Sequence, residues 1–392
     1  MREEVRRVGL ITPTPEKLCG LKGLLESMGY EVLLEQASSP AEARGAAESL
    51  ASQGADIIVL PGSWIGPWEP LSRELGVPVV RGAWSPKLLA AIVERWGFKV
   101  LSSSVEAEKA LGYDMARLAV EELGVLRERP PRGEAFRVGG MAVPRLPPPI
   151  LVVSEVYPST CDVDRVLGEI SWRRLEGADI VAIGWDGSVD LDCYWSIVKH
   201  AIDKAQPPLA ADPGRPKLAL KAASLGVDVS MSITPRFVDE IPGELRDKAF
   251  VVVPEGGDRP SKELEVAYRK GLSRGLSRLI LDPIAFPTPY PGLLERLMEA
   301  RRLAEAHIGP IMMGANNVVE LMDADTEGSL GVTVSLMAEA GVSLVLVGEV
   351  SRKARGATWE ARIAADMASL SLYWEKPPKD LGLDLLLYKE KS

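Results

Sequence analysis

Short apolar runs alternate with amphipathic segments along nearly the whole chain. In the first hundred residues, apolar runs at 7–13, 31–37, 56–62 and 78–83 alternate with helix-patterned segments at 16–29, 39–54, 68–76 and 85–97. Continuous apolar strands separated by amphipathic helices are typical of a parallel sheet that is covered on both faces. The pattern predicts a small doubly wound α/β domain at 1–128, closed by a long helix from Val105 to Glu128.

The loops of this domain carry no familiar ligand motif. Its first strand is not followed by GxGxxG, the fingerprint of dinucleotide sites. The loop "PGSWIGPWEP" at 61–70 has two interpretations. The loop contacts a ligand, or its Pro, Gly and Trp residues only shape a rigid loop, which is the commoner case.

The second part of the chain repeats one unit. A Pro- and Gly-rich stretch at 129–149 is predicted to be a linker. Apolar runs follow at 150–156, 179–184, 208–212, 228–234, 249–255, 278–283, 310–316 and 343–350, and a helix-patterned segment comes after each. Eight strand–helix units in this length predict a (β/α)8 TIM barrel at 150–374, with a C-terminal tail at 375–392.

Polar residues close the predicted barrel strands, which is where barrel enzymes place their chemistry. These candidates are Glu155, Asp186, Asp212, Ser232, Asp282, Asn316, Asn317 and Glu320, and the basic loop after the last strand adds Arg352, Lys353 and Arg355. A single Asp in such a position is as often the cap of the next helix as a ligand. The convergence of many polar groups at one rim favours a binding site.

Composition favours a functional role for the two adjacent asparagines. Asn316 and Asn317 are the only asparagines in the chain, and Gln is also rare. Depletion of thermolabile amides together with abundant charged residues is typical of proteins from hot environments. We therefore interpret the pair as retained for function, although asparagine also tolerates tight turns.

Charge and cysteine usage limit the partners and the compartment. The net charge of −9 and pI near 5.2 argue against a nucleic-acid groove or an anionic membrane surface as partner. Cys19, Cys161 and Cys193 lie far apart in sequence, which we interpret as reduced, intracellular thiols. No signal peptide or transmembrane run is evident, so we expect a soluble, cytoplasmic protein.

Carboxylates and amides with one basic loop suit a particular ligand. Asp and Asn side chains can bind the NH/NH₂ edge of an aminopyrimidinone ring through paired hydrogen bonds. The basic loop can bind phosphate or pyrophosphate oxygens. The acidic end of the first barrel strand, Glu155, can place Mg²⁺ against the same oxygens.

Three segments carry a family resemblance. In order, "RLILDP", "MGANNVVELMDADTEG" and "EVSRKARGATWEARIAADM" resemble the dihydropteroate synthase-related proteins of archaea, which are pterin-binding barrels preceded by a small α/β domain. "IIVLPG", "LGVPVVRGA" and the tail "PPKDLGLDLLLYKEK" are also similar, so the resemblance covers nearly the whole chain.

The looser resemblance to true dihydropteroate synthases implies pterin contacts from Asp212 and Asp282, with departures. Ser232 or Thr234 stands where those enzymes carry an Asn, and Glu155 replaces the Asn that binds Mg²⁺. Their pterin-contacting lysine is missing, because "ANNVVE" replaces their SRK segment. Asn317 instead matches the Asn that pterin-dependent methyltransferases place beside N5.

The resemblance implies a transferase that joins a hydroxymethyl-dihydropterin pyrophosphate to an arylamine, with a pterin as substrate or cofactor. Two alternatives stay open: methyl transfer from a methyl-tetrahydropterin, and pterin binding without catalysis. In the first reading Arg352, Lys353 or Arg355 stabilises the departing pyrophosphate. Barrels of this kind often form homodimers, and the sequence does not decide between monomer and homodimer.

Overall fold

The computed structural model describes residues 5–256 and 259–387 and divides into two compact units. The first comprises Met1–Val120 with Ser371–Leu383, and the second Glu121–Leu370 with Asp384–Ser392. This division differs from the predicted boundaries at 128 and 150. Part of the predicted tail belongs to the first unit, and its last residues, 388–392, lie outside the described residues.

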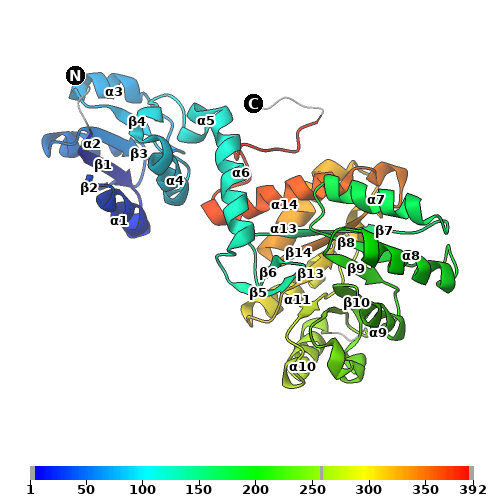
Figure 1. Cartoon of the computed structure of the whole chain (residues 1–392). Coiled ribbons are helices and arrows are strands. Elements are labelled where there is room, and N and C mark those ends of the chain that lie inside the picture. Colours follow the sequence, from blue (N-terminus) through cyan, green and yellow to red (C-terminus); the bar gives the residue numbers. More distant parts are fainter. Residues whose placement is uncertain (1–4, 257–258, 388–392) are drawn as a thin grey trace. The chain divides into compact units, whose positions relative to one another are not determined.

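The first unit contains a parallel sheet with helices on both faces. Its strands β1 (Arg7–Thr12), β2 (Glu31–Gln36), β3 (Ile57–Leu60) and β4 (Val79–Arg81) lie in the order β2-β1-β3-β4 (Figure 1). Helix α1 (Cys19–Ser27) packs against α4 (Pro86–Trp96), and α2 (Ala43–Ser52) packs against α3 (Trp68–Leu75). The predicted doubly wound domain is confirmed.

The long helix predicted from Val105 to Glu128 is two helices. Helix α5 (Ala107–Leu111) ends directly before Gly112, and α6 (Tyr113–Glu128) begins directly after Gly112. Gly112 has φ of 54°, a left-handed conformation that interrupts a right-handed helix and that glycine adopts without steric cost.

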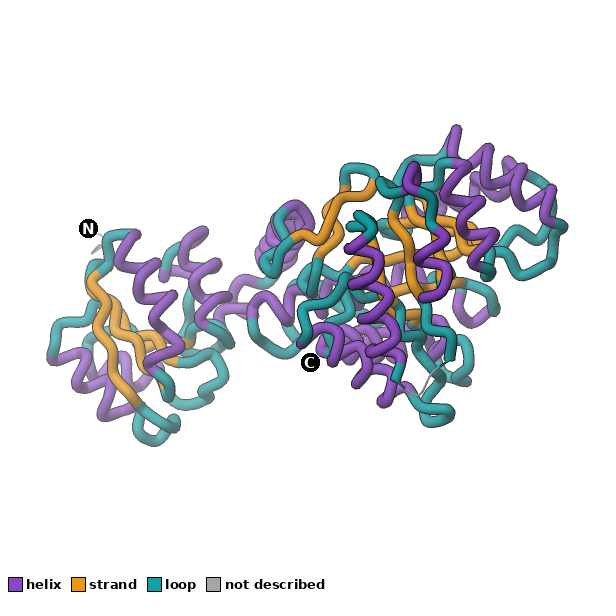
Figure 2. Tube along the Cα trace, turned by 90° about the horizontal axis from the view of Figure 1, so that it is seen from below, coloured by secondary structure: helices purple, strands orange, loops and turns teal. Residues whose placement is uncertain are grey.

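The second unit is a closed barrel of eight parallel strands. They are β7 (Leu151–Val156), β8 (Ile180–Gly184), β9 (Leu209–Asp212), β10 (Val229–Ile233), β11 (Ala249–Val252), β12 (Leu279–Leu281), β13 (Met312–Gly314) and β14 (Leu344–Gly348). Their order is β12-β11-β10-β9-β8-β7-β14-β13, and a parallel bridge between Leu281 and Ile311 joins the two ends. The predicted (β/α)8 barrel is confirmed, and its helices surround the strands (Figure 2).

The barrel helices are α7 (Val163–Leu175), α8 (Leu191–Lys204), α9 (Pro216–Leu225), α10 (Pro260–Ser273), α11 (Leu293–Glu305), α13 (Thr326–Glu339) and α14 (Ala357–Trp374). Asp162 and Asp190 cap α7 and α8 by accepting backbone N–H bonds. After β10 the described chain forms only two 3-10 turns, Pro235–Glu240 and Gly243–Leu245, where a helix was predicted. Pro242 lacks an N–H and ends helical pairing there.

The stretch predicted as a linker is a β-hairpin. Strands β5 (Glu134–Val138) and β6 (Met141–Pro144) pair antiparallel around Gly139 and Gly140. Phe136, Val138 and Val143 are buried in the same core cluster as the inward residues of the barrel strands. The hairpin therefore belongs to the barrel core, because its alternating apolar residues fill space that a solvated linker would leave open.

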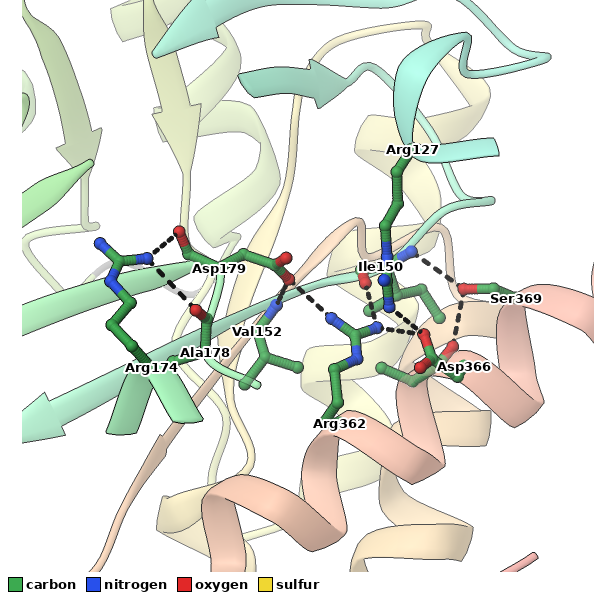
Figure 3. A network of polar contacts seen from close by, with 10 residues as sticks. Arg127, Ile150, Val152, Arg174, Ala178, Asp179, Arg362, Asp366 and Ser369 are labelled. Carbon is green, nitrogen blue, oxygen red and sulfur yellow. Dashed lines mark hydrogen bonds and ion pairs between the residues drawn. The ribbon is translucent and has the colours of Figure 1, made fainter. Parts of the chain in front are cut away.

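A buried polar network ties the last helix to the first strands (Figure 3). Arg362 of α14 donates to Asp179 Oδ2 at 2.7 Å, to Asp366 Oδ1 at 2.6 Å and to the Ile150 carbonyl at 3.0 Å. Asp179 Oδ2 also accepts the Val152 N–H at 2.7 Å. Burial alone lowers the pKa of Arg362, but the two carboxylates more than offset it and raise that pKa.

Candidate functional site

Strand alternation places three carboxyl groups at one end of the barrel. Leu151 and Val153 of β7, Ala210 of β9 and Ile280 of β12 belong to the interior core cluster. Successive side chains of a strand point to opposite faces, so the residue two positions after an interior residue also points inward. Glu155, Asp212 and Asp282 are these next inward positions, at the carboxyl ends of β7, β9 and β12.

Glu155 is buried and bonded to a tyrosine. Its Oε2 accepts a hydrogen bond from the Tyr157 hydroxyl at 2.9 Å, and Glu155 is 4% exposed. The Tyr157 ring lies so close to β8 that a β-carbon on Gly184 would come within 2.5 Å of Tyr157 Cε1. Residue 184 must therefore be glycine for this ring to pack beside Glu155.

Asp212 is held by the neighbouring strand. Its Oδ1 accepts the Ser232 hydroxyl at 2.6 Å and the Gly214 N–H at 3.0 Å. Ser232 reaches it from a β10 backbone with φ of 66°, at a register shift in the pairing with β11. A non-glycine residue in this region carries strain of about 1–3 kcal/mol, of a kind that gathers at functional sites.

Asp282 is fixed in a similar way. Its Oδ1 accepts the Ile284 N–H at 2.7 Å, and the residue is 7% exposed. Ile284 has φ of 60°, which is an outlier for a β-branched side chain. In all three carboxyl groups one oxygen is committed to the protein, and the second has no protein partner among the described residues.

The three carboxyl groups interact electrostatically. Burial, and then the charge of Asp212, raise the pKa of Glu155 to about 8. Burial raises the pKa of Asp282 to about 7, against the Ile284 N–H bond and with the help of Asp212. At neutral pH Glu155 is therefore mostly protonated, so the site offers carboxyl donors as well as acceptors.

The two asparagines are oriented in opposite senses at the start of the short helix α12 (Asn316–Val319). Asn316 Oδ1 accepts the Asn317 N–H at 3.0 Å, so its Nδ2 is left as a donor. Asn317 Nδ2 donates to the Ala285 carbonyl at 3.1 Å, so its Oδ1 is left as an acceptor. A carbonyl can only accept, which fixes the Asn317 amide without ambiguity. The pair presents one donor and one acceptor.

Two glycines lie next to this pair, and one of them makes room for it. A β-carbon on Gly314 would lie 2.7 Å from Asn316 Oδ1. A β-carbon on Gly348, at the end of β14, would lie 3.9 Å from Asn316 Nδ2 and 4.0 Å from Glu155 Cβ. Gly348 therefore separates the asparagine loop from Glu155, and the space above it is lined by both.

An aromatic residue follows the second barrel strand. Trp185, directly after β8, donates its indole N–H to the Val189 carbonyl at 2.9 Å. The Arg215 guanidinium lies 5.6 Å from the Trp185 ring centroid, and the Tyr194 ring lies 6.4 Å from it. Trp185 thus offers a half-buried aromatic surface beside an exposed cation.

Other predicted site residues hold loops together. Glu320 Oε1 accepts the Val350 and Ser351 N–H groups at 3.0 and 3.2 Å. Lys353 donates to the carbonyls of Val319 and Met322. These contacts join the loops after β13 and β14.

The remaining predicted residues lie at the rim. Asp186 is exposed and its Oδ1 accepts the Ser188 N–H at 2.8 Å, which lowers its pKa. Arg352 and Arg355 are exposed beside the 3-10 turn Arg352–Ala354, with no ion-pair partner among the described residues. These two arginines are the cations of the basic loop that stay available.

The prediction of reduced thiols was wrong for two of the cysteines. Cys161 and Cys193 form a disulfide, 32 residues apart in sequence, whereas Cys19 is free and exposed. The parallel strands β7 and β8 are neighbours, so the loop after β7 and the start of α8 meet at one rim. The disulfide fixes the loop that follows Tyr157, and sequence spacing alone cannot show such a meeting.

Metal ligands are sparse at this end of the barrel. Within 5–256 and 259–387, no group of three or more His, Cys, Asp or Glu side chains has the arrangement of a metal site. Glu155 by itself would supply a single carboxylate to a cation. Mg²⁺ commonly takes only one or two protein carboxylates and keeps water and substrate phosphate oxygens as its other ligands, which such a position fits.

Sequence reasoning missed Tyr157, although a signal was present. Tyr157 stands two residues after Glu155, so the alternation that points Glu155 into the barrel predicts that Tyr157 points to the same face. The orienting role of Ala285 and the strained Ile284 had no signal, because both depend on where the chain runs after β12.

Comparisons with known proteins complete the description. No protein-family model matches the chain. An uncharacterized protein of Methanocaldococcus jannaschii is 28% identical over 258 residues, which is 62% of this chain, so the chain spans about half (49%) of that relative's length. Among the described residues, none of the helices has the length and apolar character needed to cross a membrane.

Solved structures of 7,8-dihydropteroate synthase from Vibrio fischeri (TM-score 0.46, 16% identity) and of dihydropteroate synthase from Yersinia pestis (0.45, 15%) are similar to the chain. The alignments cover 57% and 60% of this chain and 93% and 98% of those proteins. The Mycobacterium tuberculosis protein Rv1207 gives a TM-score of 0.42 at 19% identity, over 58% of this chain and 97% of its own. The chain is similar to these proteins, and at such identities they do not place it in a family.

Proposed function

We propose that the barrel binds a pterin and transfers its hydroxymethyl carbon to an arylamine, with displacement of pyrophosphate. The observation that carries the proposal is a set of polar side chains at one barrel end. In each, one polar atom is hydrogen-bonded within the protein and the other is left for a ligand: Glu155, Asp212, Asp282, Asn316 and Asn317. A pterin ring presents N–H and NH₂ donors beside a carbonyl acceptor. Carboxylate oxygens, an amide acceptor and an amide donor complement that edge.

Electrostatics supports a ring that carries no negative charge of its own. The site holds three carboxyl groups, and burial favours the neutral form of Glu155 and Asp282. Ring N–H groups that donate to Asp282 and Asp212 relieve the desolvation of those carboxylates. A ligand with a negative ring would instead leave like charges facing one another in a buried site.

The pyrophosphate end of the substrate requires positive charge. Arg352 and Arg355 are exposed at the rim and have no described ion-pair partner, so they can bind phosphate oxygens. We do not assign this role to Lys353, because it donates to the carbonyls of Val319 and Met322. Glu155, once deprotonated, would hold Mg²⁺, whose charge would neutralise the departing pyrophosphate.

In the reaction, the arylamine nitrogen forms a bond to the methylene carbon while the bond from that carbon to the pyrophosphate oxygen breaks. The amine proton passes to solvent. Alignment of the two reactants and stabilisation of the leaving group supply most of the acceleration, so no strong general base is required.

A second function is favoured by the Asn317 amide. Its Nδ2 is committed to Ala285, so Oδ1 is the atom available to a ligand. An acceptor in this position suits a protonated N5 of a methyl-tetrahydropterin, the form from which a methyl group leaves. This alternative has no use for Arg352 and Arg355.

The test is calorimetric titration with 6-hydroxymethyl-7,8-dihydropterin pyrophosphate and with a methyl-tetrahydropterin, each with and without Mg²⁺. We expect the pyrophosphate ester to bind more tightly with Mg²⁺, and Asp282→Asn to weaken it by about tenfold to a hundredfold through loss of a charge-assisted bond. Asp190→Asn is the matched control, because Asn caps α8 as well as Asp does.

Turnover separates the two reactions. Release of pyrophosphate with 4-aminobenzoate as the arylamine, weakened in a double Arg352→Ala and Arg355→Ala variant, supports the synthase reaction. Tighter binding of the methyl-tetrahydropterin, independent of Mg²⁺ and lost in Asn317→Ala, supports methyl transfer. If neither pterin binds, the pterin site is refuted.

A further inference from the structure

A second site candidate lies in the first unit. A cavity of about 310 Å³ opens at the carboxyl ends of β1, β3 and β4, lined by segments within 10–21, 59–64 and 83–89. In the strand order β2-β1-β3-β4 the connections after β1 and β3 leave toward opposite faces of the sheet. Open α/β sheets bind ligands in the crevice that forms at such a switch point.

Two tryptophans line this cavity from adjacent loops. Trp64 follows β3 and is half-buried, and Trp84 follows β4 and is 51% exposed. Their backbones are fixed, because Trp64 N–H donates to the Pro61 carbonyl at 3.0 Å and Trp84 N–H donates to Glu108 at 2.9 Å. Indole rings on rigid loops offer flat apolar surfaces on which an aromatic ring can stack.

The loops after β3 and β4 pack closely against each other. A β-carbon on Gly62 would lie 2.6 Å from the Ala83 carbonyl carbon, so only glycine allows this approach. Buried Arg81 donates from Nε to the Gly62 carbonyl at 3.1 Å and forms an ion pair with Glu106 at 2.9 Å. The cavity wall is therefore formed before any ligand arrives, which lowers the entropic cost of binding.

The loop after β1 adds positive charge and hydroxyl groups. Lys17 lines the cavity, is exposed, and has no ion-pair partner among the described residues. Thr12 and Thr14 also line the cavity. The one acidic lining residue, Glu375, is already paired with Lys87 at 2.8 Å. The uncompensated charge in this cavity is positive and suits an anionic group.

We propose that this cavity binds a phosphorylated planar heterocycle of mononucleotide size. The ring stacks on Trp64 and Trp84, and the phosphate binds Lys17 and the threonine hydroxyls. The volume of about 310 Å³ is at the lower end of the roughly 300–1,000 Å³ of small-molecule sites, which favours a mononucleotide over a dinucleotide. The absence of GxGxxG after β1 agrees with this size.

The probes are flavin mononucleotide, riboflavin and adenosine monophosphate, titrated into the full chain and followed by tryptophan fluorescence and calorimetry. We expect one of the two mononucleotides to bind with a Kd below about 100 μM. If flavin mononucleotide is the one, riboflavin, which lacks the phosphate, should bind at least about tenfold more weakly. Lys17→Ala should weaken the mononucleotide by about tenfold or more and leave riboflavin unchanged.

Matched variants make the test specific. Lys22→Ala removes a lysine of the following helix, α1, that lies outside the cavity lining, and it should have no effect. Trp84→Ala should weaken every probe that binds by about fivefold to a hundredfold, whereas Trp172→Ala, an exposed tryptophan of α7, should not. The four substituted side chains, Lys17, Lys22, Trp84 and Trp172, are exposed or half-buried, so the variants should fold. Thermal melting followed by circular dichroism checks this.

The barrel must be excluded as the binding place, because a flavin ring resembles a pterin. Asp282→Asn should leave mononucleotide binding unchanged, so failure of the pterin site does not affect this result. Binding that is lost in Asp282→Asn and kept in Lys17→Ala overturns the proposal. Absence of binding by both mononucleotides up to about 1 mM also overturns it.

Discussion

The pH dependence of barrel stability tests the buried carboxyl groups directly. The pKa of Glu155 is about 8 in the folded protein against an ordinary 4.5, and burial is the main cause. A carboxyl group whose folded pKa is raised contributes its full stability below the unfolded pKa. That contribution is lost as the pH rises through the folded pKa, because the unfolded chain then gives up its proton more readily.

The size of the loss follows from the two pKa values. The difference between 4.5 and about 8 corresponds to roughly 5 kcal/mol in total. Between pH 5 and pH 8.5, roughly 4 kcal/mol of this should be lost from the free energy of unfolding. Glu155→Gln removes the titrating group and keeps an acceptor for the Tyr157 hydroxyl. The variant should therefore lose roughly 4 kcal/mol less than the natural chain over this pH range.

The assay must observe the barrel alone, because a chain of two units does not unfold in one step. Hydrogen exchange of peptides from 150–184, measured in increasing guanidinium at pH 5 and pH 8.5, reports the opening of the first two barrel strands. The control is Glu169→Gln, a surface glutamate of α7 that pairs with Arg165. It should change the pH dependence by less than about 0.5 kcal/mol. Equal losses in the natural chain and in Glu155→Gln would refute the reasoning.

Four further predictions follow from other contacts. Arg362→Met, which leaves Asp179 without its ion-pair partner and Asp366 with Arg127 alone, should destabilise the barrel by about 3 kcal/mol, whereas Arg269→Met on the exposed face of α10 should cost less than about 1 kcal/mol by guanidinium denaturation. Cys161→Ser should lower stability by about 3–4 kcal/mol under oxidising conditions, for a closed loop of 32 residues, and should cost far less in a reducing agent. Gly184→Ala should displace the Tyr157 ring and weaken pterin binding in calorimetry without a comparable loss of stability, since only a contact of 2.5 Å with a ring edge must be relieved. Mg²⁺-dependent binding of the pyrophosphate ester should strengthen from pH 6.5 to pH 8.5, because the proton of Glu155 must leave before a cation binds, and a flat pH profile would argue against Glu155 as the ligand.

The alternation of apolar strands and amphipathic helices determined both folds from sequence alone. Strands buried on both faces need continuous apolar runs, and eight of them in series close into a barrel. The two-residue alternation along each strand also predicted that Glu155, Asp212 and Asp282 point inward at one barrel end. Successive side chains of a strand point to opposite faces, so the position of a residue along its strand decides its face. Local signals of this kind survive in the sequence because they depend on near neighbours along the chain.

Contacts between segments that lie far apart in the sequence were decided only by the tertiary structure. Glu320 and Lys353 were candidates by position, and only the structure shows that their contacts join two loops. The Cys161–Cys193 disulfide and the hairpin that fills the barrel core depend on which strands become neighbours. The opposite orientations of Asn316 and Asn317 depend on one carbonyl from the loop after β12. Sequence periodicity gives the face on which a side chain lies, and packing decides which partner it meets there, since burial requires each polar group to find one.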